Sequence, residues 1–273
     1  MIPHTFSLSS PAKINWSLQI GKMQENGLHE ICTEMEKISL ADTVEIEMLS
    51  QGKEGEILFS LENPNQFPVP QDETNLAVRA ALSFFNTRDF PALSLRLTKQ
   101  IPSGAGLGGG SSNAATVLKA LFQIFPERRT QKELFAIAKE LGSDVPFFLG
   151  NSSRTLVEGT GEKLTPLFGH SDGFLTLCLP KNISIATAWA YFEWEKTKPK
   201  TTNGNDFEPI VFSAFPELAY RKEVLKNLGA EKVALSGSGG TVFGVFSEKE
   251  KAEKGKEVCE NLGDWTAVCP FAE

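Results

Sequence analysis

Hydrophobic and polar residues alternate along much of the first hundred positions. The stretches 13–21 (KINWSLQIG) and 43–49 (TVEIEML) have a period of two, and 93–98 (LSLRLT) places its three leucines on one face. This spacing predicts the strands of a sheet. From Thr74 the spacing becomes helical over 74–86 (TNLAVRAALSFFN), and Thr74 is the expected N-cap of a helix packed on that sheet.

Two further helices are predicted in the middle of the chain. The first covers 112–125 (SNAATVLKALFQIF). The second begins at Thr130, with Glu133 placed three residues later as in a capping box, and ends at Gly142.

The last third of the chain mixes both kinds of element. We expect a helix over 213–229, two strands flanking the SGSGG stretch at 236–240, and a last helix over 247–263. The order of helices and strands is mixed and does not follow regular β-α-β alternation. The predicted fold class is therefore α+β.

Composition agrees with an ordinary globular protein. The 273 residues are 41% apolar, enough for one large domain or two lobes, and 62–75 and 195–206 have the composition of surface loops. No run of about 18 apolar residues occurs, and the amino terminus lacks a signal-peptide pattern. We expect a cytoplasmic protein without a membrane partner.

Charge and cysteine content exclude two classes of site. The net charge of -7 argues against a nucleic-acid-binding surface, and the charges in 251–258 (KAEKGKEV) alternate in sign as on an exposed helix. The four cysteines are scattered without a CxxC pair, and only three histidines, His4, His29 and His170, are present. We therefore expect reduced structural thiols and no zinc cluster. The cysteines are Cys32, Cys178, Cys259 and Cys269.

A glycine-rich loop separates the predicted strand 93–98 from the helix 112–125. Gly104, Gly106 and Gly109 match GxGxxG, but Pro102 interrupts the approach from the strand. A dinucleotide fold also needs a second strand that ends in an acidic residue about 20 residues after these glycines. Here that position lies in sequence with a helical pattern. A dinucleotide site is therefore not favoured.

The phosphate-loop pattern GxxxxGK[ST] also fails, because Gly110 stands where the lysine before Ser111 is required. A glycine run that enters a helix can still bind an anion without a lysine, through backbone N–H groups and the helix N-terminus. The alternative is a flexible turn with an ordinary serine cap. Five glycines in seven positions, 104–110, favour the anion site.

Three segments resemble the motifs of the GHMP kinases, in the order of that family. PSGAGLGGGSSNAA (102–115) resembles its phosphate-binding motif, PAKINWSL (11–18) its first motif, and ALSGSGGTVFGVF (234–246) its third. The resemblance implies a two-lobed α+β fold with a catalytic cleft. It implies an ATP-binding lobe over 1–151 and a substrate lobe over 152–273.

Further segments resemble the branch of this family whose substrate is a cytidine diphosphate sugar alcohol. They are GLHE (27–30), TNLAVRA (74–80), LGSDVPFF (141–148), EGTGEKL (158–164) and NDFE (205–208). The implied activity is ATP-dependent phosphorylation of that small molecule with Mg²⁺, without an obligate protein partner. Two alternatives are a homoserine or mevalonate type of GHMP kinase and a non-catalytic ligand sensor on the same fold. The GLHE and NDFE segments speak against the first, and the presence of both Lys13 and Asp144 speaks against the second.

By the same resemblance, Lys13 and Asp144 are the catalytic residues. Taken alone, they would be a strand-edge lysine and a helix-capping aspartate. Mg²⁺ is expected on Ser111, Ser112 and Asp144. The expected ATP phosphate contacts are Pro102, Gly104, Gly106, Leu107, Gly108, Gly109, Gly110, Ser111 and Ser112.

The resemblance also implies the residues that bind the two bases. Asn75 and Lys99 match positions near the adenine. The substrate residues are Asn15, Leu28, His29 and Tyr191, with His29 reading the cytosine edge and Tyr191 placed opposite Leu28. Leu28 stands where the family usually has a tyrosine that stacks on the cytosine, so a weaker affinity for the substrate is expected.

Overall fold

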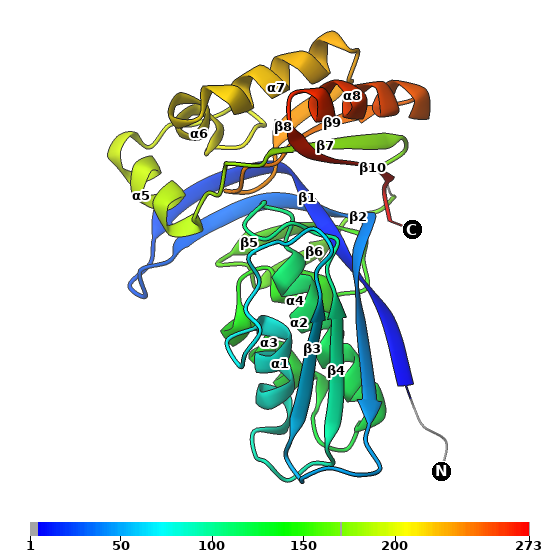
Figure 1. The fold of residues 1–273 in the computed structure, drawn as a ribbon. Coiled ribbons are helices and arrows are strands. Elements are labelled where there is room, and N and C mark those ends of the chain that lie inside the picture. The colour runs from blue at the N-terminus through cyan, green and yellow to red at the C-terminus, as the bar shows by residue number, and fades with distance from the viewer. Residues whose placement is uncertain (1–4, 170, 273) are drawn as a thin grey trace. The chain divides into compact units, whose positions relative to one another are not determined.

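A computed structural model describes residues 5–169 and 171–272, so His4 and His170 lie outside the described residues. The chain divides into two compact units that are not contiguous in sequence (Figure 1). The strands β1 (Thr5–Met23) and β2 (His29–Met48) contribute to both units. Unit 1 comprises the residues up to Ala12, Ala41–Ser103 and Gly108–Asn151; unit 2 comprises Lys13–Leu40, Gly104–Leu107 and the residues from Ser152 onward. The lobes 1–151 and 152–273 stay a prediction.

The strands of unit 1 confirm the period-two pattern. The strand β3 (Ile57–Glu62) runs parallel to β4 (Leu93–Thr98), and β4 pairs antiparallel with the carboxy-terminal half of β2. Leu93, Leu95 and Leu97 are all buried, whereas Arg96 between them is exposed. One face of this sheet therefore forms part of the core.

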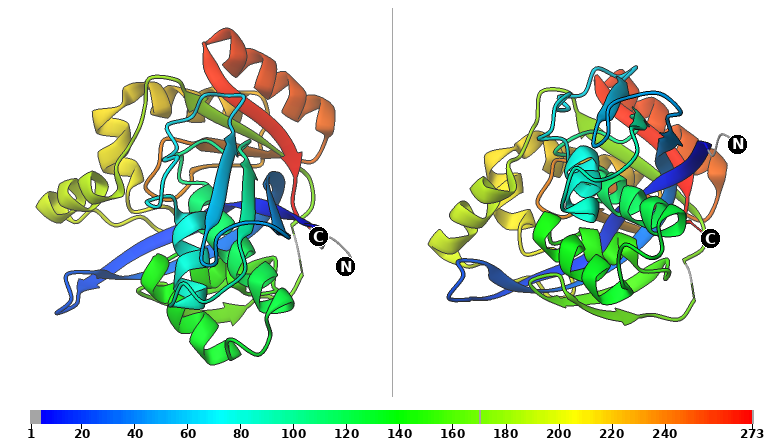
Figure 2. Two further views of the ribbon diagram at one scale, coloured as in Figure 1. Left: turned by 60° about the horizontal axis from the view of Figure 1, so that its bottom comes forward. Right: turned by 90° about the horizontal axis from the view of Figure 1, so that it is seen from below.

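Four helices complete unit 1, and Figures 1 and 2 show them grouped beside β3 and β4. The helix α2 contacts the other three. Their bounds are α1 (Leu76–Phe85), α2 (Gly109–Ile124), α3 (Gln131–Leu141) and α4 (Val145–Leu149).

The capping box predicted for α3 is confirmed. The Thr130 hydroxyl accepts from the Glu133 backbone N–H, and the Glu133 carboxylate accepts from the Thr130 backbone N–H at 2.7 Å. The predicted cap of α1 is wrong by one residue. Asn75 is the N-cap, because its Oδ1 accepts from the Ala77 N–H at 2.9 Å, whereas the Thr74 hydroxyl is bonded to Asp72.

Unit 2 contains a four-stranded antiparallel sheet with the strand order β10-β7-β9-β8. In addition, the first half of β2 pairs with β5, and β5 pairs with β6. The helices α7 and α8 lie on one side of the four-stranded sheet (Figure 1). The elements are β5 (Arg154–Gly159), β6 (Lys163–Pro166), β7 (Phe174–Pro180), α5 (Thr187–Thr197), α6 (Glu208–Ala214), α7 (Pro216–Asn227), β8 (Lys232–Leu235), β9 (Val242–Phe246), α8 (Lys249–Asn261) and β10 (Asp264–Pro270). The α+β class is confirmed.

The structure corrects the predicted helix over 213–229. Two helices occupy this region, and they meet at Phe215 and Pro216. Proline lacks a backbone N–H and is favoured in the first turn of a helix, so Pro216 starts α7 and cannot continue α6. The strands flanking 236–240 are confirmed as β8 and β9.

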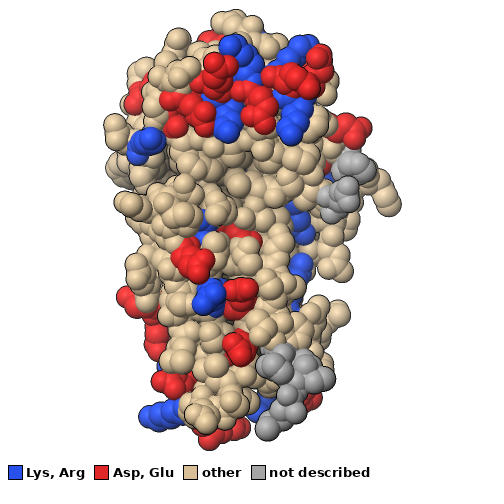
Figure 3. All heavy atoms as spheres, turned by 45° about the vertical axis from the view of Figure 1, so that its right-hand side comes forward, with Lys and Arg blue, Asp and Glu red and all other residues tan. Residues whose placement is uncertain are grey.

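The charges of α8 are interspersed, as expected. Lys251 pairs with Glu248, and Lys254 pairs with Glu257. Figure 3 shows lysine, arginine and acidic side chains interspersed at the top of the displayed face. Within the described ranges, no helix combines the length and the apolar content needed to cross a bilayer.

We predict that Asn75→Ala lowers the free energy of unfolding by about 1 kcal/mol, because it removes the N-cap of α1. Thr74→Ala should cost less, since Thr74 is exposed and its hydroxyl does not cap the helix. Urea unfolding of the ligand-free protein measures both changes. A loss for Thr74→Ala as large as that for Asn75→Ala would contradict this cap.

Candidate functional site

Lys13 lies in β1, and its side chain is only 3% exposed. The Nζ atom donates to the Asn15 Oδ1 at 2.6 Å and to the Gly106 carbonyl at 2.8 Å, and the Lys13 backbone N–H donates to the Leu107 carbonyl at 3.0 Å. A buried ammonium group needs such acceptors to offset its lost hydration. Lys13 is therefore held by both backbone and side chain against the first half of the glycine loop.

Asn15 is two residues along the same strand, on the same face as Lys13. Its Nδ2 donates to the Thr33 hydroxyl at 2.8 Å, and that hydroxyl donates to the Ser17 carbonyl at 2.6 Å. This chain of bonds sets the orientation of the amide. The Asn15 oxygen consequently faces the Lys13 ammonium.

The glycine loop and the SGSGG loop are in direct backbone contact within unit 2. The Ser236 hydroxyl donates to the Gly106 carbonyl at 3.0 Å, and the Thr241 N–H donates to the Ala105 carbonyl at 3.2 Å. A Cβ at Gly106, whose φ is +81°, would lie 2.0 Å from the Ser236 carbonyl oxygen. A Cβ at Gly239 would lie 2.1 Å from the Gly106 nitrogen. Both positions therefore need glycine for this contact.

The second half of the glycine loop starts α2 in unit 1. Gly108, with φ +71°, is the N-cap, and no side chain caps the helix. The serine cap that was part of the alternative to an anion site is therefore wrong. Exposed Gly110 and half-buried Ser111 lie in the first turn, where the N-terminal end of the helix dipole favours an anion.

A buried polar network lies beneath this start of α2. Lys99, 3% exposed, forms an ion pair with Asp42 and donates to the Asn113 Oδ1 at 3.2 Å. The Asn113 Nδ2 donates to Asp42 and to the Ser10 hydroxyl, each at 2.9 Å, and Ser10 donates to the Ser112 hydroxyl at 2.9 Å. Burial lowers the pKa of Lys99, although Asp42 opposes that effect. The Ser112 hydroxyl thus faces the protein interior.

Asp42 was not among the predicted residues. It also accepts the backbone N–H groups of Gln100 and Ile101, at 2.7 and 2.9 Å, where the chain leaves β4 for the loop. Asp42 and Lys99 are 57 positions apart, and no local pattern links them. Only the pairing of β2 with β4 brings these two side chains together.

Asn75 and Asp144 lie at the starts of two other helices of unit 1. The start of α1 lies beside the start of α2, since a Cβ at Gly110 would be 3.3 Å from the Leu76 side chain. Asp144 is half-buried at the N-cap of α4 and makes no capping hydrogen bond, so it is not a helix-capping aspartate. A Cβ at Gly142, two residues earlier, would be 3.9 Å from the Ser111 hydroxyl. The segment leading to Asp144 therefore lies beside Ser111.

His29 and Tyr191 form a second group in unit 2. Their rings stack with centroids 5.2 Å apart and an angle of 9° between planes, and Trp194 meets the His29 ring edge-on at 5.4 Å. The His29 Nδ1 lies 3.2 Å from the Gly21 carbonyl, and Nε2 lies 3.2 Å from the Glu195 carboxylate, without hydrogen-bond alignment. Leu28 is 54% exposed at the turn before β2.

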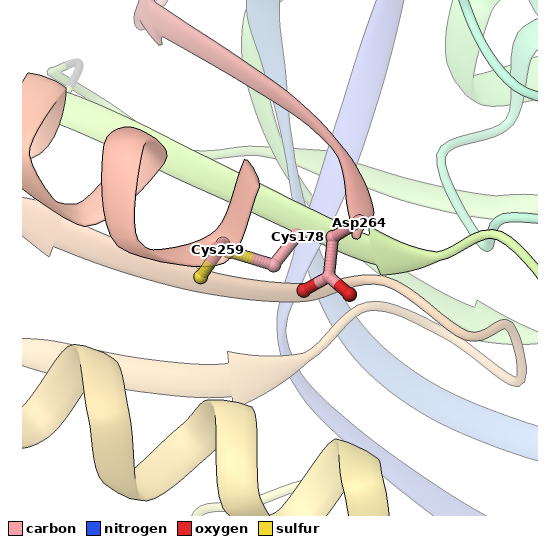
Figure 4. A group of neighbouring side chains, drawn as sticks. All are labelled: Cys178, Cys259 and Asp264. Atoms are coloured by element: carbon pink, nitrogen blue, oxygen red, sulfur yellow. The ribbon is translucent and has the colours of Figure 1, made fainter. Parts of the chain in front are cut away.

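The fold also gathers three possible metal ligands that are far apart in sequence. Cys178, Cys259 and Asp264 come from β7, α8 and β10, and their ligand atoms lie within 4.8 Å of one another (Figure 4). The two carboxylate oxygens of Asp264 each accept a bond from the Arg221 guanidinium at 2.9 Å. Because the Arg221 charge already compensates this carboxylate, the arrangement serves packing and gives no support for a cation site.

The four thiols differ in accessibility. Cys32 is half-buried and lines an open hollow of about 310 Å³, whereas Cys178, Cys259 and Cys269 are buried. The hydrogen bond with Cys259, together with burial, raises the pKa of the Cys178 thiol, and burial raises the pKa of Cys269 to about 11. Burial also raises the pKa of Cys32, with a contribution from Glu158.

We therefore predict that a thiol reagent at mildly alkaline pH modifies Cys32 first in the folded protein, and all four cysteines after unfolding in urea. Absorbance from a colorimetric disulfide reagent measures the number of reactive thiols. Cys32→Ser should remove the first phase of the reaction. Rapid modification of a second thiol in the folded wild-type protein would contradict the burial of the other three.

Family models match two parts of the chain. The model described as "GHMP kinases N terminal domain" matches residues 75–151, and the model described as "GHMP kinases C terminal" matches residues 198–264. The first match contains the whole glycine loop, 104–110, and Asp144. The second contains the SGSGG loop.

Relatives similar over nearly the whole chain share one name. The 4-diphosphocytidyl-2-C-methyl-D-erythritol kinase of Desulfotalea psychrophila is 35% identical, over 97% of this chain and 92% of its own length. The kinase of the same name from Methylacidiphilum infernorum is 37% identical, over 88% of this chain and 86% of its own length.

Solved structures give the same result. A crystal structure of 4-(cytidine 5'-diphospho)-2C-methyl-D-erythritol kinase superposes with a TM-score of 0.80 at 30% identity, covering 98% of this chain and all of that one. The homoserine kinase of Cytophaga hutchinsonii, with a TM-score of 0.66 at 16% identity over 100% of this chain and 96% of its own, shares the fold. The chain therefore belongs to the GHMP kinases and, within them, to the family of 4-diphosphocytidyl-2-C-methyl-D-erythritol kinases.

Proposed function

We propose that this kinase transfers the γ-phosphoryl group of ATP to the 2-hydroxyl of 4-diphosphocytidyl-2-C-methyl-D-erythritol, in the non-mevalonate (methylerythritol phosphate) route to isoprenoid precursors. The observation that carries the proposal is 35% identity, over 97% of this chain, to a kinase of that name. The homoserine and mevalonate alternatives have weaker support, since the homoserine kinase above is 16% identical and a mevalonate kinase from Methanococcus jannaschii is 15% identical.

Lys13 and Asp144 are the catalytic residues in this proposal. The substrate oxygen forms a bond to the γ-phosphorus as the bond to the β-phosphate oxygen breaks, and the hydroxyl proton passes to the Asp144 carboxylate. The Lys13 ammonium offsets the negative charge that accumulates during transfer. Its buried position, fixed by Asn15 and Gly106, supports this role because a preorganised charge costs no reorganisation during the reaction.

The loop from Pro102 to Ser112 binds the ATP phosphates in this proposal. Its glycines at 104, 106 and 108 have φ angles of +68°, +81° and +71°, which L side chains rarely adopt. Such a backbone presents N–H groups without side chains in the way, and the uncapped start of α2 adds the favourable end of its dipole.

Mg²⁺ is proposed on Ser111 and Asp144. Hydroxyl and carboxylate oxygens are the ligands this ion prefers, and the segment leading to Asp144 lies beside Ser111. Ser112 fits less well, because its hydroxyl is fully buried and accepts the bond from Ser10. When bound, Mg²⁺ neutralises phosphate charge.

The two reactants each carry a base, cytosine in the substrate and adenine in ATP. We propose that His29, Tyr191 and Leu28 hold the cytosine, with Asn15 contacting the substrate near Lys13. The ring stack of His29 on Tyr191 supports this role, since it fixes both rings before the substrate binds. Asn75 and Lys99 are proposed to border the adenine, within the ATP-binding lobe 1–151, and the substrate lobe is proposed over 152–273.

ADP release by the purified protein with ATP and Mg²⁺ tests the function. The substrates to compare are 4-diphosphocytidyl-2-C-methyl-D-erythritol, homoserine, mevalonate and galactose. Turnover with the cytidyl substrate alone is expected. Turnover with another alcohol would move the activity to a different GHMP kinase, and ATP binding without any turnover would favour the ligand sensor.

We predict that Asp144→Asn lowers kcat at least about 100-fold, because the amide cannot accept the hydroxyl proton. The affinity for nucleotide measured without Mg²⁺ and the thermal unfolding temperature should stay near the wild-type values. Asp89→Asn, an exposed aspartate of the same unit, is the matched control. Residual activity above a tenth of the wild-type kcat would remove Asp144 from its catalytic role.

We also predict that Leu28→Tyr lowers KM for the cytidyl substrate. A stacked aromatic ring contributes about 0.5–1.5 kcal/mol, which corresponds to roughly a 2- to 12-fold change. The exposed position of Leu28 leaves space for the larger side chain. Steady-state kinetics should show an unchanged KM for ATP, and Leu28→Met serves as the non-aromatic control. An unchanged or higher KM for the cytidyl substrate would show that residue 28 does not face the base.

A further inference from the structure

The segment 205–208, with the sequence NDFE, has no part in the chemistry proposed above. Asn205 is 1% exposed, Asp206 is fully buried, and Phe207 is 1% exposed. Buried polar groups are retained with hydrogen-bond partners, because an unpaired one is costly. The hydrogen-bond partners of Asn205 and Asp206 therefore show which parts of the structure this segment holds in place.

The Asn205 side chain binds the end of β8 and the SGSGG loop. Its Nδ2 donates to the Leu235 carbonyl at 2.9 Å and to the Gly237 carbonyl at 2.7 Å. Its Oδ1 accepts the Phe207 N–H at 2.9 Å. An amide nitrogen carries two protons, so both donors are used on the two carbonyl groups.

Gly237 connects Asn205 to Lys13. A Cβ at Gly237 would lie 3.2 Å from the Asn15 Oδ1 and 3.3 Å from the Lys13 Nζ, so the open side of the Gly237 Cα faces these two side chains. The position of Gly237 consequently limits where the Lys13 ammonium can lie. Asn205 fixes that position through the Gly237 carbonyl.

Asp206 binds the other end of β1. Its carboxylate accepts the Ile20 N–H at 2.9 Å, the Thr201 N–H at 2.8 Å, the Thr201 hydroxyl at 3.0 Å and the Lys200 Nζ at 3.0 Å. Burial alone would raise the pKa of Asp206, but these hydrogen bonds hold it below its ordinary value. The carboxylate is therefore ionised at neutral pH, and it anchors Ile20 immediately before Gly21, whose carbonyl faces the His29 Nδ1.

Backbone contacts place the segment alongside β1. The Leu18 N–H donates to the Gly204 carbonyl at 3.0 Å, and the Asp206 N–H donates to the Leu18 carbonyl at 2.8 Å. Phe207 meets the Tyr191 ring edge-on, with centroids 5.0 Å apart. One short segment thus contacts residues next to Lys13 and residues next to His29.

We propose that Asn205 and Asp206 are positioning residues of the kinase reaction: Asn205 holds Gly237 against Lys13, and Asp206 holds the end of β1 beside His29. The inference rests on the proposed function, because it takes Lys13 as a catalytic residue and His29 as a cytosine-binding residue. Asn205 acts on the chemical step and Asp206 on substrate binding, each through another residue.

The test compares Asn205→Asp, Asn205→Ala and Asp206→Asn with wild type, all as full-length protein. Asn205→Asp has nearly the same shape but turns an oxygen toward two carbonyl oxygens, which adds repulsion, whereas Asn205→Ala only removes the donors. Asp206→Asn replaces one accepting oxygen by an amide that cannot accept. Asn182→Asp, at an exposed position of unit 2, is the matched control.

We expect Asn205→Asp to lower kcat about 10- to 100-fold with a small change in KM for the cytidyl substrate, because a shift of about 1 Å in a catalytic group has an effect of this size. Asn205→Ala should lower kcat by a smaller factor than Asn205→Asp. Asp206→Asn should raise KM for the cytidyl substrate about 10-fold and leave KM for ATP unchanged. If kcat per folded molecule and both KM values were unchanged in Asn205→Asp and Asp206→Asn, the proposal would be overturned.

Hydrogen exchange of the ligand-free proteins provides a measurement that does not depend on activity. Asn205→Asp should speed exchange of the backbone amides at 236–239, and Asp206→Asn should speed it at 18–21. If wild type fails to phosphorylate the cytidyl substrate, the proposed function fails, and hydrogen exchange still decides whether Asn205 and Asp206 fix these segments. Unchanged exchange at both places would overturn the positioning roles.

Discussion

The structure around the proposed site depends on one requirement, that a buried charge be surrounded by groups that compensate it. The Asn15 oxygen and the Gly106 carbonyl compensate the Lys13 ammonium, and Asp42 and Asn113 compensate Lys99. Two of these acceptors are themselves held in place, Asn15 by Thr33 and Asp42 by two backbone N–H groups. Gly106 of the glycine loop and Asn113 of α2 are thus each bound to a buried lysine, which needs partners of defined geometry.

Much of this molecule could be predicted from local sequence. The alternation in β4, the Thr130 capping box and the strands around 236–240 follow from spacing and turn chemistry, and the structure confirms them. The family motifs gave the kinase family and the cytidyl branch, which the comparisons confirm. The errors were local: Asp72 binds the hydroxyl of Thr74, which leaves the cap of α1 to Asn75, and Pro216 divides the predicted helix over 213–229.

The tertiary contacts could not be predicted in the same way. Asp42 and Lys99 meet only because β2 pairs with β4, and Asn205 reaches Gly237 across 32 positions. Cys178, Cys259 and Asp264 are likewise separated in sequence and gathered by three elements. Local propensity carries no information about contacts between residues far apart in sequence, because strand pairing and helix packing determine them. The roles of the site residues therefore remain predictions that rest on the family resemblance and on these contacts.

The contact between the two glycine-rich loops has a consequence for the order in which the chain can acquire its structure. The Ser236 hydroxyl and the Gly106 carbonyl are 130 positions apart, so the first half of the glycine loop cannot reach its final conformation until β8 and the following turn exist. During synthesis, the ribosome must complete most of the chain before that loop is ordered. A nascent chain ending before residue 236 would contain every residue of the phosphate-binding motif, yet it would lack the backbone surface against which half of that motif is shaped.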